Sequence, residues 1–81
     1  MQIKALFFAS YRDIAGTDEL HVELPEGASV ADLVGSLRSR GSSWASLPPQ
    51  PAVAVNLTYS RLGVPLVNGD EVAFIPPVSG G

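Results

Sequence analysis

Hydrophobic and polar residues alternate strictly at residues 19–24, which is the simplest pattern in the chain. Leu20, Val22 and Leu24 occupy every second position, and charged or polar residues lie between them. Because side chains along a strand point alternately to its two faces, this spacing predicts a strand with one buried face. Residues 2–9, QIKALFFA, alternate poorly and are rich in strand formers, so they predict a strand buried on both faces. The short connection between the two segments predicts an antiparallel pair.

Residues 29–41 carry the clearest helix signal. Four hydrophobic residues have the i, i+3, i+4, i+7 spacing that forms one helical stripe: Val30, Leu33, Val34 and Leu37. Ser29 is placed to cap the N-terminus, and Asp32 puts an acid in the positive first turn. Gly41 is placed to end the helix.

The rest of the chain predicts short elements. Residues 10–18 predict a helical turn that ends at Gly16. Composition then indicates, in order, a loop (42–51), a strand (52–56), a connection with one short strand (57–66), a turn at Asn68-Gly69-Asp70 and a last strand (71–75). Strand pairing is expected to end at Pro76 and Pro77, because proline has no N–H to donate.

This order of elements predicts an α+β fold, with a mixed sheet of about four to five strands and one main helix across one face. That is the outline of a β-grasp, ubiquitin-like fold. A ferredoxin-like α+β sandwich is the alternative, although the second helix that it needs is hard to find. We expect a β-grasp domain over residues 1–75 and an extended C-terminal tail over residues 76–81 that ends in Gly-Gly.

Composition narrows the class of protein. The 81 residues suffice for one domain, and 46% hydrophobic with 16% charged residues indicates a globular chain. No apolar run approaches the roughly 20 residues of a membrane helix, and no secretory signal is visible, so we expect a cytoplasmic protein that does not bind membranes. The net charge of -3 without a basic stripe argues against nucleic acid as a partner.

The usual catalytic constellations are missing. With no cysteine and one histidine, the chain offers neither a thiolate nucleophile nor a cluster of metal ligands. His21 is expected to be a solvated residue on the polar face of its strand, and no phosphate-binding loop occurs. The carboxylates at Asp70 and Glu71 are better explained by the turn and the strand surface than by acid–base chemistry. We therefore expect no metal, no permanently bound cofactor and no enzymatic activity of the chain on its own.

The C-terminal tail is the remaining candidate for chemistry. ATP can convert a terminal carboxylate into an acyl-adenylate, which a nucleophile can attack. Gly80 and Gly81 have no Cβ, so they can pass through a narrow tunnel and leave the last carbonyl unshielded. Pro76 and Pro77 project the tail from the domain as a stiff arm. Such an arm serves either conjugation to an amine or transport of sulfur as a thiocarboxylate, and the alternative is a frayed end without function.

Three segments carry a resemblance to a known family: FFASYRDIAG, AVAVN and the closing LVNGDEVAFIPPVSGG. Together they resemble the small, sulfur-carrier subunits of molybdopterin synthases, which are ubiquitin-like. The closing segment is the most specific part. It is less similar to the sulfur carriers of the thiazole pathway, which end in Gly-Gly but usually lack the double proline.

The resemblance implies a pathway and partners. An E1-like adenylyltransferase would use ATP to adenylate Gly81, and a sulfur donor protein would convert it into a thiocarboxylate, a C-terminal 1-thioglycine. The tail would then enter the large, catalytic subunit of molybdopterin synthase in a heterotetramer of two small and two large subunits. There the sulfur would pass to cyclic pyranopterin monophosphate to form the dithiolene of molybdopterin.

The resemblance also implies roles for individual residues. Gly81 would carry the reactive group, and the tail-threading residues would be Gly80, Ser79, Val78, Pro77 and Pro76. The partner interface would include four residues: Phe7, Tyr59, Phe74 and Ile75. Relatives often have an aliphatic residue at the position of Tyr59 and an aromatic one at that of Ile75, so this part of the interface would be repacked. For Phe7 and Phe74, burial in the core is the alternative.

Other functions stay open at this point. The chain could carry sulfur for another pathway, such as thiazole synthesis or tRNA thiolation, or it could be a ubiquitin-like modifier joined to lysines. A plain interaction domain with an inert tail is a third possibility.

Overall fold

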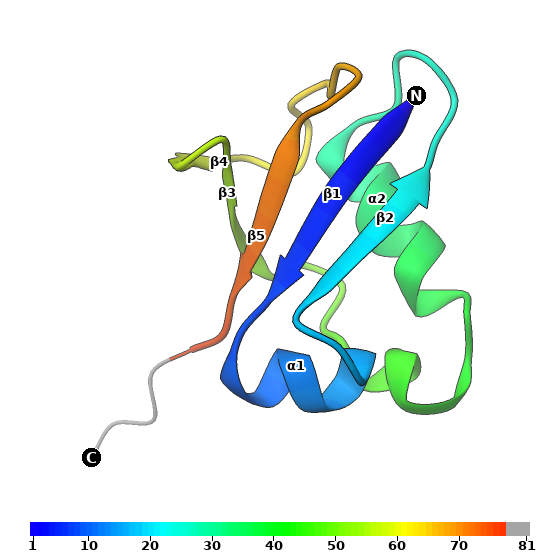
Figure 1. Ribbon diagram of the computed structural model, residues 1–81, viewed down its shortest axis with the longest axis vertical. Coiled ribbons are helices and arrows are strands. Elements are labelled where there is room, and N and C mark those ends of the chain that lie inside the picture. Colours follow the sequence, from blue (N-terminus) through cyan, green and yellow to red (C-terminus); the bar gives the residue numbers. More distant parts are fainter. Residues whose placement is uncertain (78–81) are drawn as a thin grey trace.

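The computed structural model describes residues 1–77, which form one mixed sheet and three helical segments (Figure 1). In chain order the elements are β1 (Gln2–Phe7), α1 (Ala9–Ala15), β2 (Glu19–Glu23), α2 (Val30–Arg38), the 3₁₀ helix η1 (Ser42–Ser46), β3 (Ala52–Val55), β4 (Thr58–Ser60) and β5 (Glu71–Ile75). The strand order is β2-β1-β5-β3-β4, with β1 and β5 parallel at the centre and the other pairs antiparallel. The predicted β-grasp fold is thus confirmed. The sandwich alternative is wrong, because α1 lies at the end of the sheet beside η1 rather than next to α2 (Figure 1).

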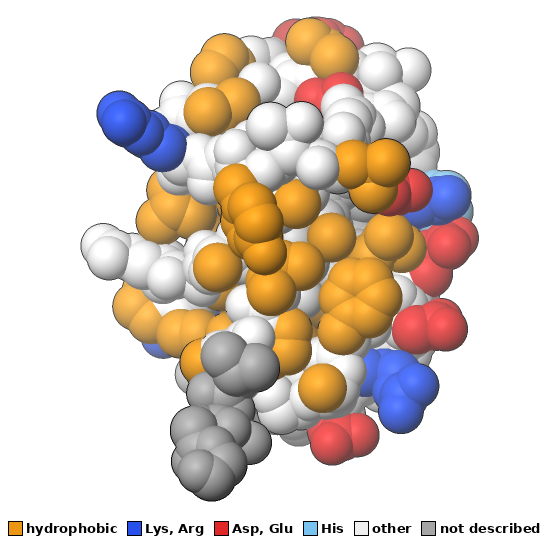
Figure 2. Space-filling view, turned by 90° about the vertical axis from the view of Figure 1, so that its left-hand side faces the viewer, with side chains coloured by type: hydrophobic (Ala, Val, Ile, Leu, Met, Phe, Trp, Pro, Cys, Tyr) orange, Lys and Arg blue, Asp and Glu red, His pale blue; other side chains and the backbone are white. Residues whose placement is uncertain are grey.

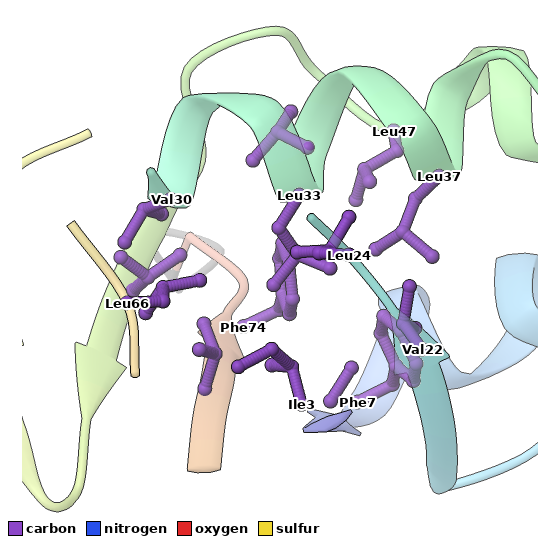
Figure 3. Packing of buried hydrophobic residues seen from close by; sticks show 14 of the residues in the cluster. Ile3, Phe7, Val22, Leu24, Val30, Leu33, Leu37, Leu47, Leu66 and Phe74 are labelled. Atoms are coloured by element: carbon purple, nitrogen blue, oxygen red, sulfur yellow. The ribbon is translucent and has the colours of Figure 1, made fainter. Parts of the chain in front are cut away.

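The core lies between α2 and one face of the sheet (Figure 3). Its largest fully buried side chains come from both layers: Ile3, Phe7, Val53, Val72 and Phe74 from strands, and Val30, Leu33, Val34 and Leu37 from α2. Along β1 the buried residues alternate with half-buried ones such as Lys4 and Leu6. The prediction that this strand is buried on both faces is therefore wrong, because α2 covers only one face of the sheet.

The start of α2 is as predicted, but its end is not. Ser29 and Asp32 form a capping box, in which the Ser29 backbone N–H donates to Asp32 Oδ2 at 2.8 Å. The helix ends at Arg38, and Ser39 still has right-handed dihedral angles. Gly41, with φ of 79°, instead lies directly before η1 as its N-cap residue. The predicted loop over 42–51 therefore contains a 3₁₀ helix, whose Trp44 packs edge-on against Phe7 with ring centroids 5.4 Å apart.

The helix α1 ends as the sequence predicts. Gly16 has φ of 73°, and its N–H donates to the Arg12 carbonyl at 2.8 Å. Across residues 1–77, no helix has both the length and the apolar character that crossing a membrane requires.

A buried carboxylate joins two turns at the start of β5. Asp70 is only 9% exposed, and its two oxygens accept from Asn56 Nδ2 at 2.9 Å and from the Val67 N–H at 2.8 Å. Asn56 Oδ1 in turn accepts from the Glu71 N–H at 3.0 Å. Asp70 therefore fixes the β3–β4 turn and the β4–β5 connection to the beginning of the central strand.

Candidate functional site

The C-terminal arm begins at the end of β5, in the middle of the sheet. The last register pairs of β5 are Phe74 with Phe7 of β1 and Ile75 with Ala52 of β3. Pro76 and Pro77 follow at the end of the sheet near α1 (Figure 1), and neither can donate a backbone hydrogen bond. The arm is therefore anchored on a strand that is paired on both sides.

The face of the sheet opposite α2 carries an apolar surface beside the root of the arm. Strand alternation turns six residues to this face, which we name the sheet-face patch: Leu6, Ala52, Ala54, Tyr59, Ala73 and Ile75. The register makes it continuous, since Ala73 pairs with Leu6 on one side and with Ala54 on the other. Figure 2, seen from the side of β3 and β4, shows hydrophobic side chains gathered in the middle and charged ones mainly along the right margin. A continuous apolar surface of this kind favours binding of a partner.

The other half of this face is charged. Lys4 Nζ lies 3.8 Å from Glu19 Oε1 and 3.9 Å from Glu71 Oε2, and His21 Nε2 lies 3.3 Å from Glu19 Oε2. All four side chains are about one-third to two-thirds exposed, so water screens these pairs and each contributes little to stability. The expected surface position of His21 is confirmed. The face thus has an apolar half near the arm and a charged half near β2.

A groove of about 370 Å³ lies at the root of the arm. Its walls come from α1, the segment before β3, the β3–β4 hairpin and the end of β5, and they include Tyr11, Pro51, Tyr59 and Pro76. Burial raises the pKa of the Tyr11 phenol above its ordinary value. The groove offers apolar walls and a phenol, which suits binding of a partner's side chain rather than catalysis.

The predicted tail residues are only partly described. Val78, Ser79, Gly80 and Gly81 lie outside the described residues. Pro76 is half-buried and Pro77 is exposed, and both line the groove. The division into a domain over 1–75 and a tail over 76–81 therefore stays a prediction, as do the roles of the tail residues.

The four residues predicted for the partner interface divide into two pairs. Tyr59 is 75% exposed and Ile75 is half-buried, and both belong to the sheet-face patch. Phe7 and Phe74 are 1% and 0% exposed and stack on each other with ring centroids 5.2 Å apart. Their assignment to an exposed patch is corrected, and the alternative of core burial is confirmed, because both side chains point towards α2.

Phe8 is an exposed aromatic residue that was not predicted from the sequence. This residue is 49% exposed and directly follows β1, with extended dihedral angles of φ −124° and ψ 151°. An extended backbone turns it to the face opposite Phe7, on the side of Leu6. The period-two series Ile3, Ala5, Phe7 was the signal that could have separated the buried phenylalanine from the exposed one.

Comparison with known proteins gives consistent matches over the whole chain. A model of the ThiS family matches residues 5–81. The molybdopterin synthase sulfur carrier subunit of Chlamydomonas reinhardtii is 41% identical, with 100% of both chains covered. The subunit of the same name from Escherichia coli K12 is 40% identical, with 98% of this chain and 99% of that one covered.

Solved structures share the fold. SAMP1 from Haloferax volcanii superposes with a TM-score of 0.86 at 28% identity, covering 100% of both chains. A second structure from that organism, named small archaeal modifier protein 1, has a TM-score of 0.83 at 26% identity and covers 95% of this chain and 98% of that one. One chain of the complex of subunits 1 and 2 of the molybdopterin-converting factor from Helicobacter pylori has a TM-score of 0.72 at 22% identity, covering 100% of both chains.

Proposed function

Because this chain belongs to the ThiS family, and its curated relatives include molybdopterin synthase sulfur carrier subunits that match it end to end, we propose that it is the sulfur-carrier subunit of a molybdopterin synthase. The observation that carries the proposal is an arm ending in Gly80-Gly81 that leaves the central strand through two prolines beside an apolar patch. The chain itself is not an enzyme in this proposal. Other proteins load its terminus and use the sulfur.

Loading begins at the carboxylate of Gly81. In an E1-like adenylyltransferase, a carboxylate oxygen attacks the α-phosphorus of ATP and pyrophosphate leaves, which produces an acyl-adenylate. Sulfide-level sulfur from a donor protein then displaces AMP, so that one carboxylate oxygen is replaced by sulfur. The result is a thiocarboxylate, the C-terminal 1-thioglycine, and no cofactor stays bound to this chain.

The arm supplies access for both steps. Gly80 and Gly81 have no side chains to clash with a tunnel wall, and Ser79 and Val78 link them to the rigid prolines. Because Pro76 and Pro77 are already restricted, entry into an active site costs conformational freedom mainly in the four residues that follow them. The terminus can therefore visit the activating enzyme and the large subunit in turn.

Delivery takes place in the large, catalytic subunit. The sheet-face patch and the groove dock this chain, and the arm brings the thiocarboxylate to cyclic pyranopterin monophosphate. Each thiocarboxylate gives one sulfur atom to the pterin, and water supplies the oxygen that returns the terminus to a carboxylate. The dithiolene of molybdopterin contains two sulfur atoms, so its formation uses two loaded chains. We propose an assembly of two small and two large subunits in the cytoplasm, where the activation step has access to ATP.

Intact-mass measurement tests this function. When the chain is co-expressed with an E1-like enzyme and a sulfur donor, we expect its mass to rise by one oxygen-to-sulfur exchange. Activity of the enzyme is verified independently through exchange of pyrophosphate into ATP. An unchanged mass in the presence of active partners would count against a sulfur carrier.

The patch gives a second prediction. Replacing Tyr59 by Ser should weaken binding to the large subunit by about 10-fold, because exposed aromatic residues at interfaces commonly contribute this much when they become buried. The Tm should stay nearly constant, since 75% of this residue is already exposed. Glu19→Gln, on the charged half of the same face, is the matched control. Equal affinities of the Tyr59 and Glu19 variants would exclude the patch as the docking surface.

A protein modifier is the second candidate, favoured by the similarity to the small archaeal modifier protein 1. It would use the same adenylate but would end in an isopeptide bond to lysine. Immunoblots against this chain would then show adducts of higher mass that disappear when the terminal glycines are removed. Adducts without any thiocarboxylate would select this function over the first.

A further inference from the structure

The β3–β4 hairpin turn contains a leucine, Leu57, at a position with positive φ. Val55 pairs with Thr58, so Asn56 and Leu57 form a two-residue turn, with φ of 49° and 73°. Positive φ at both central positions is typical of a type I′ turn, in which Asn-Gly is the favoured sequence. Leucine is disfavoured there, because its Cβ crowds the neighbouring carbonyl.

The two turn residues differ in the contacts that offset the cost of their positive φ. Asn56 is held by hydrogen bonds to Asp70 and to the Glu71 backbone. Leu57 is 91% exposed and does not belong to the core cluster of the described residues. Among residues 1–77, the other non-glycine residues with positive φ are Ala9, Ser42 and Asn56, which are all smaller or polar. Leu57 thus combines an unfavourable positive φ with a branched side chain that is almost fully exposed.

Leu57 lies within reach of a partner that covers the sheet-face patch. The Asn56 N–H donates to the Glu71 carbonyl at 2.8 Å, which places the turn level with the start of β5. Ile75 lies four residues further along that strand, or about 13 Å away at the usual rise per residue. A standard interface buries about 800 Å² per partner, a patch roughly 28 Å across. An interface of this size, beginning at the root of the arm, includes the hairpin tip.

We propose that Leu57 is a docking residue that inserts into an apolar pocket of the large subunit, an inference that rests on the proposed function. The large subunit is the fitting partner, because a stable assembly covers more surface than a transient encounter with the activating enzyme. Binding of the side chain by that subunit explains why an exposed leucine stands at a position that favours glycine. Strain of this kind is commonly retained where it serves function.

The test combines stability with affinity. Leu57→Gly should raise the Tm of the isolated chain by about 3 °C, because glycine adopts this φ freely, although its greater freedom in the unfolded chain offsets part of the gain. The same variant should bind the large subunit about 10-fold more weakly. Leu57→Met keeps an apolar side chain and should retain affinity within about 2-fold without a gain in Tm.

Ser42→Gly is the matched control, since Ser42 has φ of 53° and is exposed on η1, away from the sheet-face patch. It should raise the Tm without changing the affinity. An unchanged affinity of Leu57→Gly, or a Tm that does not rise, would overturn the role of Leu57 while leaving the sulfur carrier intact. If the wild-type chain does not bind the large subunit at all, the proposed function itself fails.

Discussion

Deleting Gly81 should lower the rate of thiocarboxylate formation by at least about 100-fold while leaving the Tm of the domain unchanged. One residue of fully extended chain spans at most about 3.5 Å, and a misplacement of about 1 Å at a reacting group can already cost about 100-fold in rate. The core of the described residues is not touched, because Phe74 of β5 is its last member along the chain. Single-turnover loading assays, followed by intact mass, would measure the effect.

Two controls separate the effect of the arm's length from other effects of changing the terminus. Gly81→Ala keeps the length and adds one methyl group, so it should lose less activity than the deletion. The shortened chain should still bind the large subunit through the sheet-face patch and should therefore compete with the wild-type chain. Loading of the shortened chain at the wild-type rate would show that the position of the terminal carboxylate does not matter.

Replacing Asp70 by Ala should destabilise the domain by about 3 kcal/mol, the largest stability effect that we expect outside the apolar core. The carboxylate accepts from Asn56 Nδ2 and from the Val67 N–H, and hydrogen bonds to charged groups contribute about 1.5–3 kcal/mol each. Without Asp70, both donors lose a charged partner that is itself only 9% exposed. For a domain of this size, the Tm should fall by roughly 15–20 °C.

The matched variants are Asp70→Asn and Asp13→Ala. Asparagine keeps one acceptor oxygen and the shape of the side chain, so about half of the loss should be recovered. Asp13 is an exposed acid on α1, and its removal should change stability by less than about 0.5 kcal/mol. If urea denaturation gave the Asp70 and Asp13 variants the same stability, the carboxylate would have no structural role.

Local signals explain which elements could be predicted from the sequence. The start of α2 depends on Ser29 and Asp32, three residues apart, and the end of α1 depends on Gly16 alone. The central pairing of β1 with β5 joins residues such as Lys4 and Glu71, which no local pattern connects. For the same reason, the open outer face of β1 could not be predicted, since it depends on where α2 lies.

In the candidate site, too, features that depend on neighbouring residues could be predicted, and features that depend on the fold could not. The C-terminal tail could be proposed as the reactive part from the sequence, because Pro76, Pro77 and the two glycines are adjacent, and its role stays a prediction. The apolar surface was predicted only in part, because Phe7 and Phe8 differ by one residue and point to opposite faces. Asp70 was expected to act in the turn, but its contact with Asn56 depends on two segments that only the folded sheet brings together.

The position of β5 between β1 and β3 also determines how the domain responds to traction. A pull on the chain after Pro77 acts along the axis of β5, while the interstrand hydrogen bonds run across that axis on both sides. Such a load is shared by many bonds at once in shear, whereas a pull on an edge strand could unzip them one after another. A pulling force on the C-terminal arm is therefore resisted without unfolding of the sheet.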